Sequence, residues 1–358
     1  MLSIDSVIVG GETHAYRFSN ADGKTWLVPS HELSTALQLY QPGGAKGKLL
    51  KSLFPYLHWL KPVRALLHAS SERVALRTDI RLMLEDVFGH NEFGFSMFGG
   101  TPSVHQKITL QVSDGKKILG YCKLTDSEAI RKLFLHEKAL LDTLHEAGLE
   151  GIPRCIGCST LSDGTSFFVQ STVKTSRSFS PYLWTPLHEA FLKRMSELTI
   201  MSVKFEKSDL GISLLALKTN IARIPSGMRQ VIEPVLDDIL KEYTGNTMEY
   251  SAFHADFTPW NMFIENEGLF VFDWEYGRMT YPPMLDRYHF FIQQSLHVAH
   301  LAPERIYSGL KRLSWFDSNE YRMYLLDIIS RFTMREEGKL SPALIGMLHN
   351  WCTLLAFR

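Results

Sequence analysis

The sequence predicts an α+β protein with a strand-rich first half and a helix-rich second half. Between residues 91 and 175, short apolar runs alternate with turn residues, as in antiparallel strands. From residue 186 onward, apolar residues recur mainly at the spacing of amphipathic helices. The chain has 358 residues, 45% of them hydrophobic, so it can bury a large core in two or three domains. We expect an extension over residues 1–90, a small β-rich lobe over 91–175 and a larger helical lobe over 176–358.

The extension begins with a predicted hairpin, because HAYRFSN and KTWLVPS flank Ala21-Asp22-Gly23. A basic segment, residues 45–64, follows. From Leu33 to Ser71 there is no acidic residue, and leucines and aromatic residues alternate with five basic ones, Lys46, Lys48, Lys51, Lys61 and Arg64. Such a segment can lie on an anionic membrane as a peripheral contact or pack on the small lobe with its lysine stems outward. We favour packing, because Pro55 and Pro62 would interrupt one continuous helix.

The small lobe is predicted from the order of its elements. FGFSMFGGT, HQKITLQV and KILGYCKL read as three strands, the last two joined by a turn at Ser113-Asp114-Gly115. A helix follows between an N-cap at Ser127 and a stop at Gly148. Two more strands come next, the first containing Cys155 and Cys158 and the second FFVQ. With no second pair at zinc-ligand spacing, these two cysteines read as thiols in a strand.

The large lobe contains FHADFTPWNMFIENEGLFVFDWE, from Phe253 to Glu275, which carries the chemistry. Asp256 can accept a proton from an attacking hydroxyl. Asn261 and Asp273 offer the hard oxygen ligands that Mg²⁺ prefers. If Glu265 pairs with Leu269 in a hairpin, Asn261 lies opposite Asp273 and the two can share one metal ion.

The pattern HADFTPWN followed by FDWE resembles the aminoglycoside phosphotransferase and choline kinase superfamily, which has the bilobal protein-kinase-like fold. The resemblance implies a phosphotransferase (kinase) with ATP and Mg²⁺ as cofactors. In it, Asp256 is the catalytic aspartate, His254 supports the loop, and Asn261 and Asp273 hold the metal. The chain lacks the H-R-D, D-F-G glycine and A-P-E segments of protein kinases, which favours a small-molecule acceptor. Asp286 resembles the aspartate that supports the catalytic loop in this superfamily, or is an ordinary acidic residue of a helix's first turn.

This template also assigns the nucleotide-binding residues of the small lobe. Lys123, late in the third strand, is the expected cation for the α- and β-phosphates, and Glu137 in the helix is its expected partner. Gly99 and Gly100 can form a phosphate-binding loop or an ordinary hairpin turn, because no G-x-G-x-x-G is present. His289, His297 and His300 are expected to pack between helices or lie on the surface.

Composition limits the remaining functions. The net charge is zero and the isoelectric point is near 7.2, so no nucleic-acid partner is indicated. No signal peptide and no membrane span are predicted, and the protein is expected in the cytoplasm.

Taken with the resemblance, the sequence predicts an ATP- and Mg²⁺-dependent transfer of the γ-phosphate to a hydroxyl of a small molecule. A sugar or glycolipid intermediate is preferred, because Trp184 and Tyr276 can stack on a sugar ring. The alternative is a catalytically silent, kinase-like nucleotide-binding or regulatory module.

Overall fold

The computed structural model describes residues 2–20, 22–42, 45–66, 68–100, 106–335 and 340–357. The side chains of Ala45, Lys46 and Leu50 lie outside the described part. The chain forms two compact units, each with its own core. The first comprises Met1–Glu146, Glu150–Ser180 and Met262–Glu275, and the second Ala147–Leu149, Pro181–Asn261 and Tyr276–Arg358.

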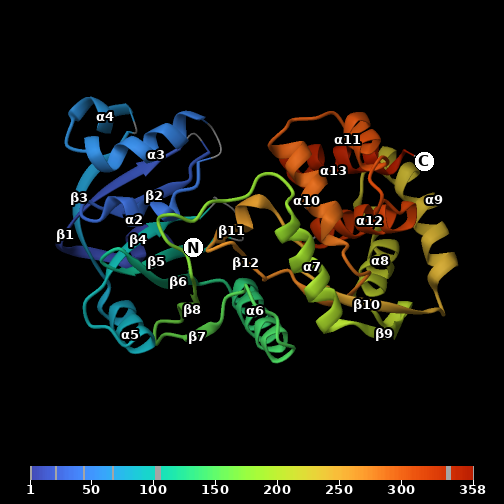
Figure 1. The fold of residues 1–358 in the computed structure, drawn as a ribbon, viewed down its shortest axis with the longest axis horizontal. Helices are drawn as coiled ribbons and strands as arrows, with labels where there is room; N and C mark the ends of the chain where they lie inside the picture. Colours follow the sequence, from blue (N-terminus) through green and yellow to red (C-terminus); the bar gives the residue numbers. More distant parts are fainter. Residues whose placement is uncertain are drawn as a thin grey trace. The chain divides into compact units, whose positions relative to one another are not determined.

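An eight-stranded sheet, antiparallel at each strand pair, is the framework of the first unit (Figure 1). Its order is β3-β1-β2-β4-β5-β6-β8-β7. The strands are β1 (Ile8–Ser19), β2 (Thr25–Pro29), β3 (Ser70–Leu76), β4 (Gly94–Phe98), β5 (Ile108–Asp114), β6 (Lys117–Thr125), β7 (Cys155–Thr160) and β8 (Ser166–Ser171). The five strands predicted for the small lobe are therefore present in the predicted order, with helix α6 (Glu128–Glu146) between β6 and β7.

The two faces of this sheet carry different helices. On β6, Cys122 and Leu124 belong to one core cluster with Ile80 and Leu84 of α5 (Thr78–Phe88). Because neighbouring strand residues point to opposite faces, Lys123 points away from that cluster, and its amine contacts α6. Strand β6 therefore contributes Cys122 and Leu124 to the core on one face of the sheet and presents Lys123 on the other.

The first ninety residues supply three strands of the same sheet. The predicted hairpin is confirmed, with Tyr16 opposite Val28 and Phe18 opposite Trp26 in β1 and β2. Strand β2 also pairs with β4, where Trp26 is opposite Phe98. Helix α1 (Ile4–Val7) precedes β1. The connection from β2 to β3 contains α2 (Leu33–Ala36), η1 (Leu37–Leu39), α3 (Ala45–Leu57) and α4 (Lys61–Leu66). These residues extend the sheet beyond the strand at which the predicted small lobe begins.

The basic segment forms two helices, and one of the two expected proline effects does not occur. Pro55 lies inside α3, which continues to Leu57. A proline removes one backbone donor, and here the helix ends two residues later, so only its last turn loses a bond. Pro62 lies in the first turn of α4, where proline is well tolerated.

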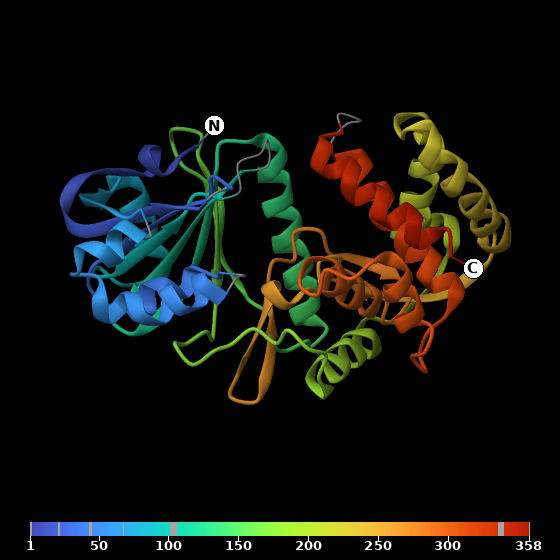
Figure 2. The same cartoon turned by 90° about the horizontal axis from the view of Figure 1, so that it is seen from above.

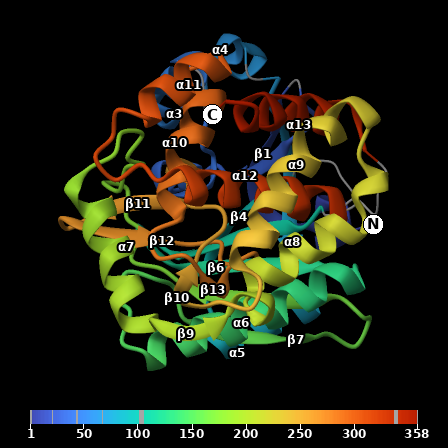
Figure 3. The same ribbon diagram turned by 90° about the vertical axis from the view of Figure 1, so that its right-hand side faces the viewer.

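The second unit is mainly helical, as predicted, around a small three-stranded sheet of order β13-β10-β9. Figures 2 and 3 show its long helices from two further sides. The elements are α7 (Pro186–Thr199), β9 (Met201–Lys204), η2 (Phe205–Lys207), α8 (Asp209–Thr219), η3 (Ile221–Arg223), α9 (Ser226–Tyr243), β10 (Thr247–Phe253), η4 (Pro259–Asn261), β13 (Arg278–Tyr281), α10 (Asp286–His297), α11 (Pro303–Leu310), α12 (Ser318–Arg335) and α13 (Pro342–Leu355). None of the described helices is both long enough and apolar enough to cross a membrane.

The predicted hairpin of the catalytic segment forms, but its register differs by one residue. Strands β11 (Met262–Glu265) and β12 (Gly268–Val271) pair Glu265 with Gly268 and Met262 with Val271. The loop is the pair Asn266 and Glu267, both in the left-handed region with φ of 48° and 63°, as in the tight two-residue turns of hairpins. The predicted pairing of Glu265 with Leu269, and with it the placement of Asn261 opposite Asp273 by register, is wrong.

Cys155 and Cys158 lie in strand β7, as predicted, and both are partly buried free thiols. A bulge between Cys155 and Gly157 interrupts the register with β8. Among the described residues, neither thiol belongs to a group with three potential metal ligands.

Candidate active site

The loop after β10 has a strained backbone, which a buried carboxylate supports through hydrogen bonds. Ala255 has φ of 70°, a left-handed conformation that is uncommon for residues other than glycine. Asp286, at the start of α10, accepts the backbone N–H groups of His254 at 2.7 Å and Ala255 at 3.1 Å. Asp286 is buried, and burial raises its pKa to about 7 even though the two N–H donors lower it. Of its two predicted roles, the contacts are those of loop support.

Asp256 presents its carboxylate from this loop with both oxygens engaged. Asn261 donates from Nδ2 to Oδ2 at 2.7 Å, and Nε2 of His289 lies 3.1 Å from Oδ1. The Asp256 side chain nevertheless keeps 35% of its surface exposed, so a substrate can reach it. His254 is buried, and its Nδ1 accepts the backbone N–H of Asp256 at 3.2 Å. These contacts orient a reachable carboxylate, and His254 contributes by holding the loop.

His289 continues this network into the core of the second unit. Its Nδ1 lies 3.3 Å from the hydroxyl of Tyr324, which accepts Nε2 of Gln293 at 3.1 Å. Burial lowers the pKa of His289, against the opposing effect of Asp256. A neutral imidazole that accepts from Tyr324 can donate only from Nε2, which faces Asp256. The prediction that His289 packs between helices is confirmed, and its contact with Asp256 is a finding that the sequence did not reveal.

A second buried network holds the same loop from α12. Arg331 donates from Nη1 to the carbonyl of Ala255 at 3.2 Å and from Nε to Asp327 Oδ2 at 2.7 Å. Asp327 is fully buried and also accepts the hydroxyl of Tyr281 at 2.7 Å. No motif marked Asp327 and Arg331, because they lie more than seventy positions downstream of the loop.

In the first unit, Lys123 and Glu137 form the predicted pair. Nζ of Lys123 lies 2.8 and 3.0 Å from the two carboxylate oxygens of Glu137, and 2.7 Å from Oδ1 of Asp273. Burial alone would lower the pKa of Lys123, but the two carboxylates outweigh it and the pKa is raised. The amine therefore stays protonated, as a cation for phosphate must be.

Asp273 is fixed by the residue that follows it. The backbone N–H of Trp274 donates to Glu137 Oε1 at 3.1 Å, and its indole N–H donates to the carbonyl of Val271 at 2.9 Å. The Trp274 side chain is completely buried, and Asp273 itself has φ of 69°. Glu137 thus binds both the amine of Lys123 and the backbone beside Asp273, which fixes these groups relative to one another.

Lys107 and Glu275 extend this charged cluster, and sequence reasoning missed both roles. Lys107, just before β5, bonds to Glu275 and lies 3.5 Å from Asp273 Oδ1. The carboxylates of Glu137, Asp273 and Glu275 offer oxygens within 4.8 Å of one another, a spacing that could hold a metal ion. The FDWE motif contains Glu275, but only the fold brings Lys107 to it across 168 positions.

The glycine pair begins the loop between β4 and β5. Gly100 has φ of 76°, and a Cβ there would lie 2.5 Å from the carbonyl oxygen of Lys107, so only glycine fits without a backbone shift. Gly99 donates its N–H to the carbonyl of Thr25 at 2.8 Å. The following residues, 101–105, lie outside the described part. The choice between a phosphate-binding loop and a plain turn stays open.

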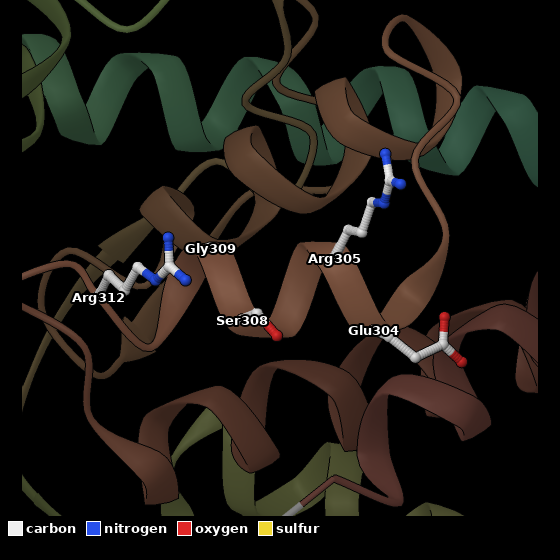
Figure 4. A pocket seen from close by; sticks show the side chains of 5 residues that line it. All are labelled: Glu304, Arg305, Ser308, Gly309 and Arg312. Carbon is white, nitrogen blue, oxygen red and sulfur yellow. The ribbon is translucent and has the colours of Figure 1, made fainter.

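A shallow pocket of about 320 Å³ lies along α11 in the second unit. Glu304, Arg305, Ser308, Gly309 and Arg312 line it (Figure 4), and all five are exposed. These residues come from one helix and its end, and contribute no member of the networks described above.

Comparison with solved structures identifies the fold. The chain is similar to a thermostable mutant of the aminoglycoside phosphotransferase APH(4)-Ia in its apo form, with a TM-score of 0.55, 10% identity, and coverage of 77% of this chain and 98% of that one. Another variant of that enzyme, in ternary complex with ADP and hygromycin B, gives a TM-score of 0.52 and 12% identity over 78% of this chain and 98% of that one. No family model matches the sequence, and no curated protein matches it. At these identities the likeness shows the fold alone: the chain has the α+β, bilobal, kinase-like fold that the motif resemblance implied.

Proposed function

We propose that this chain is an ATP- and Mg²⁺-dependent phosphotransferase that moves the γ-phosphate to a hydroxyl group of a small molecule. The observation that carries the proposal is the buried cluster of Lys123, Glu137 and Asp273. Burying ions is costly unless they are paired, and this arrangement keeps a protonated amine beside a partly exposed carboxylate. Phosphoryl transfer needs these two groups, one for the phosphates and one for the metal.

The residues proposed for Mg²⁺ fit its chemistry. Asp273 supplies a carboxylate, and Asn261 donates to Asp256 from its Nδ2, which leaves its amide oxygen for a hard cation. Held by these residues, Mg²⁺ would supply positive charge to offset the charge of the phosphates. The assignment of Asn261 and Asp273 together rests on the sequence motif, because they belong to different units.

Asp256 is proposed to orient the acceptor hydroxyl and take its proton. The carboxylate is reachable and held by Asn261 and His289, so it can act as a base without first changing its rotamer. Lys123 and, from the same cluster, Lys107 would then carry the positive charge facing the phosphates.

The acceptor is proposed to be a small hydroxylated molecule, with sugars the first class to test. Tyr276 is one aromatic residue that could stack on a sugar ring. The indole of Trp184 is already stacked on His188, with ring centroids 5.1 Å apart, and contacts Phe290 at 5.2 Å. Packing accounts for Trp184. Tyr276 also packs against the core of the second unit, with the Arg335 guanidinium 5.9 Å from its ring centroid, so the preference for sugars rests on the sequence pattern.

A screen tests this function against the catalytically silent alternative. Release of ADP from MgATP would be measured with a panel of sugars and amino alcohols, in the wild type and in Lys123→Met. The proposal predicts acceptor-stimulated ADP release that needs Mg²⁺ and is lost in the variant. A silent module would show a nucleotide-induced rise in melting temperature but no turnover above the variant with any acceptor.

A further inference from the structure

Helix α3 carries large apolar side chains on its outer face. Leu49, Leu53 and Tyr56 are spaced four and three residues apart, so they lie on one face of the helix. They are 60%, 41% and 73% exposed, respectively. An ordinary surface helix of a globular protein presents polar residues to water at such positions.

The opposite face of α3 shows the inverse pattern. Phe54 is 1% exposed and packs edge-to-face on Tyr16, with ring centroids 5.5 Å apart. Lys51 also points inward, and its Nζ donates to the carbonyl of Tyr40 at 2.6 Å. The helix therefore packs on the unit through an aromatic residue and a lysine, and leaves Leu49 and Leu53 outside. The predicted packing occurs, but it accounts for one face only.

Two more exposed apolar residues follow α3 in the chain. Trp59 is 66% exposed, and its indole N–H donates to the carbonyl of Tyr56 at 3.1 Å. Leu66, at the end of α4, is 52% exposed. We call the five residues Leu49, Leu53, Tyr56, Trp59 and Leu66 the outer face of α3–α4. A group of exposed large apolar side chains on one local segment generally marks an interaction site.

The charged residues within this segment all have one sign. Lys48 and Lys61 are exposed beside the outer face, and Arg64 lies in α4 between Lys61 and Leu66. The chain contains no acidic residue from Leu33 to Ser71. Cations flanking leucine, tyrosine and tryptophan match a surface that is negatively charged outside and apolar just beneath.

We propose that the outer face of α3–α4 docks on the surface of an anionic phospholipid bilayer. The leucines would enter the boundary between head groups and acyl chains. Trp59 and Tyr56, each with a polar tip, suit the head-group level. Lys48 and Lys61 would face the anionic lipids. The break at residues 58–60 between α3 and α4 makes two short helices in place of one, so one continuous amphipathic helix is not needed. The inference is independent of the catalytic proposal and goes beyond it.

Vesicle co-sedimentation of the full chain tests the proposal. Vesicles of phosphatidylcholine with phosphatidylglycerol should bind the wild type at low salt, and vesicles of phosphatidylcholine alone should bind it much less. High salt should release the protein, because the lysines contribute through a screened attraction. The double variant Lys48→Gln with Lys61→Gln should weaken partitioning about 30-fold, at about fivefold per lysine.

A matched pair of variants separates a specific surface from general hydrophobicity. Replacing Leu53 and Trp59 with serine removes apolar contacts from the outer face. Replacing Ile212 and Leu215 of α8 with serine removes comparable apolar side chains elsewhere, because these two residues are 56% and 39% exposed. Only the first pair should abolish vesicle binding, and circular dichroism melts should show that both variants remain folded.

Trp59 also provides a direct signal in the unmodified protein. All seven tryptophans lie among the described residues, and Trp59 alone is exposed. Vesicles with brominated acyl chains should quench part of the tryptophan fluorescence, and Trp59→Phe should remove that quenching while leaving binding nearly unchanged.

Three outcomes would overturn the proposal. The first is no vesicle binding at low salt, and the second is equal binding to neutral vesicles that salt does not affect. The third is concentration-dependent self-association or capture of an acidic protein that the Leu53 and Trp59 variant loses, without lipid binding. That result would assign the surface to a protein partner instead.

Discussion

A buried lysine and a partly buried one in the first unit should make the protein more stable as the pH rises above neutrality. Lys174 is 8% exposed, and its Nζ donates to the carbonyl of Gln38 at 3.2 Å. Burial, with a smaller contribution from Lys51, lowers the pKa of Lys174 from 10.5 to about 7. Burial also lowers the pKa of Lys51 to about 8. The Lys51 amine donates to the carbonyl of Tyr40 and the Lys174 amine to that of Gln38, and these neutral acceptors do not offset the desolvation as a carboxylate would.

The sign of the effect follows from proton binding. In the unfolded chain both amines would titrate near 10.5, so above neutral pH the unfolded state holds more protons than the folded state. Stability rises with pH wherever that is so, and it levels off above the unfolded pKa. Between about pH 7 and about pH 9, linkage gives about 2 kcal/mol from Lys174 and about 1 kcal/mol from Lys51.

Urea unfolding at the two pH values measures this directly. Lys174→Met should be more stable than the wild type at neutral pH and should gain less on going to the higher pH. Lys193→Met, at a side chain 71% exposed, is the control and should follow the wild type. Taking the difference between Lys174→Met and wild type cancels titrations common to both proteins. If Lys174→Met showed the same pH dependence as the wild type, the account of a desolvated amine would be wrong.

Three further predictions concern the candidate site. Asp273→Ala should abolish Mg²⁺-dependent ATP binding in calorimetry. Asn261→Ala removes a neutral ligand, so excess Mg²⁺ should restore its binding. Equal, metal-insensitive defects in the two variants would count against both residues as ligands. His289→Leu should lower kcat about 10- to 100-fold with KM for ATP unchanged, because it releases the Asp256 carboxylate. The control His297→Leu, at an exposed residue, should have no effect. Identical kinetics for the two variants would refute a positioning role for His289. Asp286→Ala should lower the free energy of unfolding by about 1–3 kcal/mol, since it leaves buried amides unpaired, and an unchanged denaturation midpoint would contradict this.

Much of the fold was predictable because it is written in short-range patterns. The alternation in HQKITLQV and KILGYCKL identified β5 and β6, and a helical period identified α6. Once those elements were placed, the template's order was enough to pair Lys123 with Glu137, and the two side chains do bond. Local periodicity combined with a known element order therefore predicted a contact between residues 14 positions apart.

The hairpin register shows where local reasoning failed. Gly268 read as a loop residue, but the turn is made by Asn266 and Glu267 with positive φ, and Gly268 pairs with Glu265. Asparagine adopts the left-handed conformation readily, whereas glutamate rarely does. A glycine one position later made the longer loop the natural prediction, and the error moved every cross-strand partner by one.

The contacts that the sequence did not reveal depend on long-range packing. No motif distinguishes Lys107 in HQKITLQV, and only the fold places it against Glu275. His289 was predicted to pack between helices or lie on the surface, and that prediction did not include its contact with Asp256. Likewise, the basic segment gave no means of knowing that Lys51 would point inward and Leu49 outward.

The most direct test of the central claim is the kinetics of Asp256→Asn with an acceptor found in the ADP-release screen. The substitution keeps the size of the side chain and its position beside Asn261 and His289, but removes the base. The account predicts that kcat falls by several orders of magnitude while the affinity for MgATP stays within about twofold. Turnover within about tenfold of the wild type would contradict Asp256 as the catalytic residue.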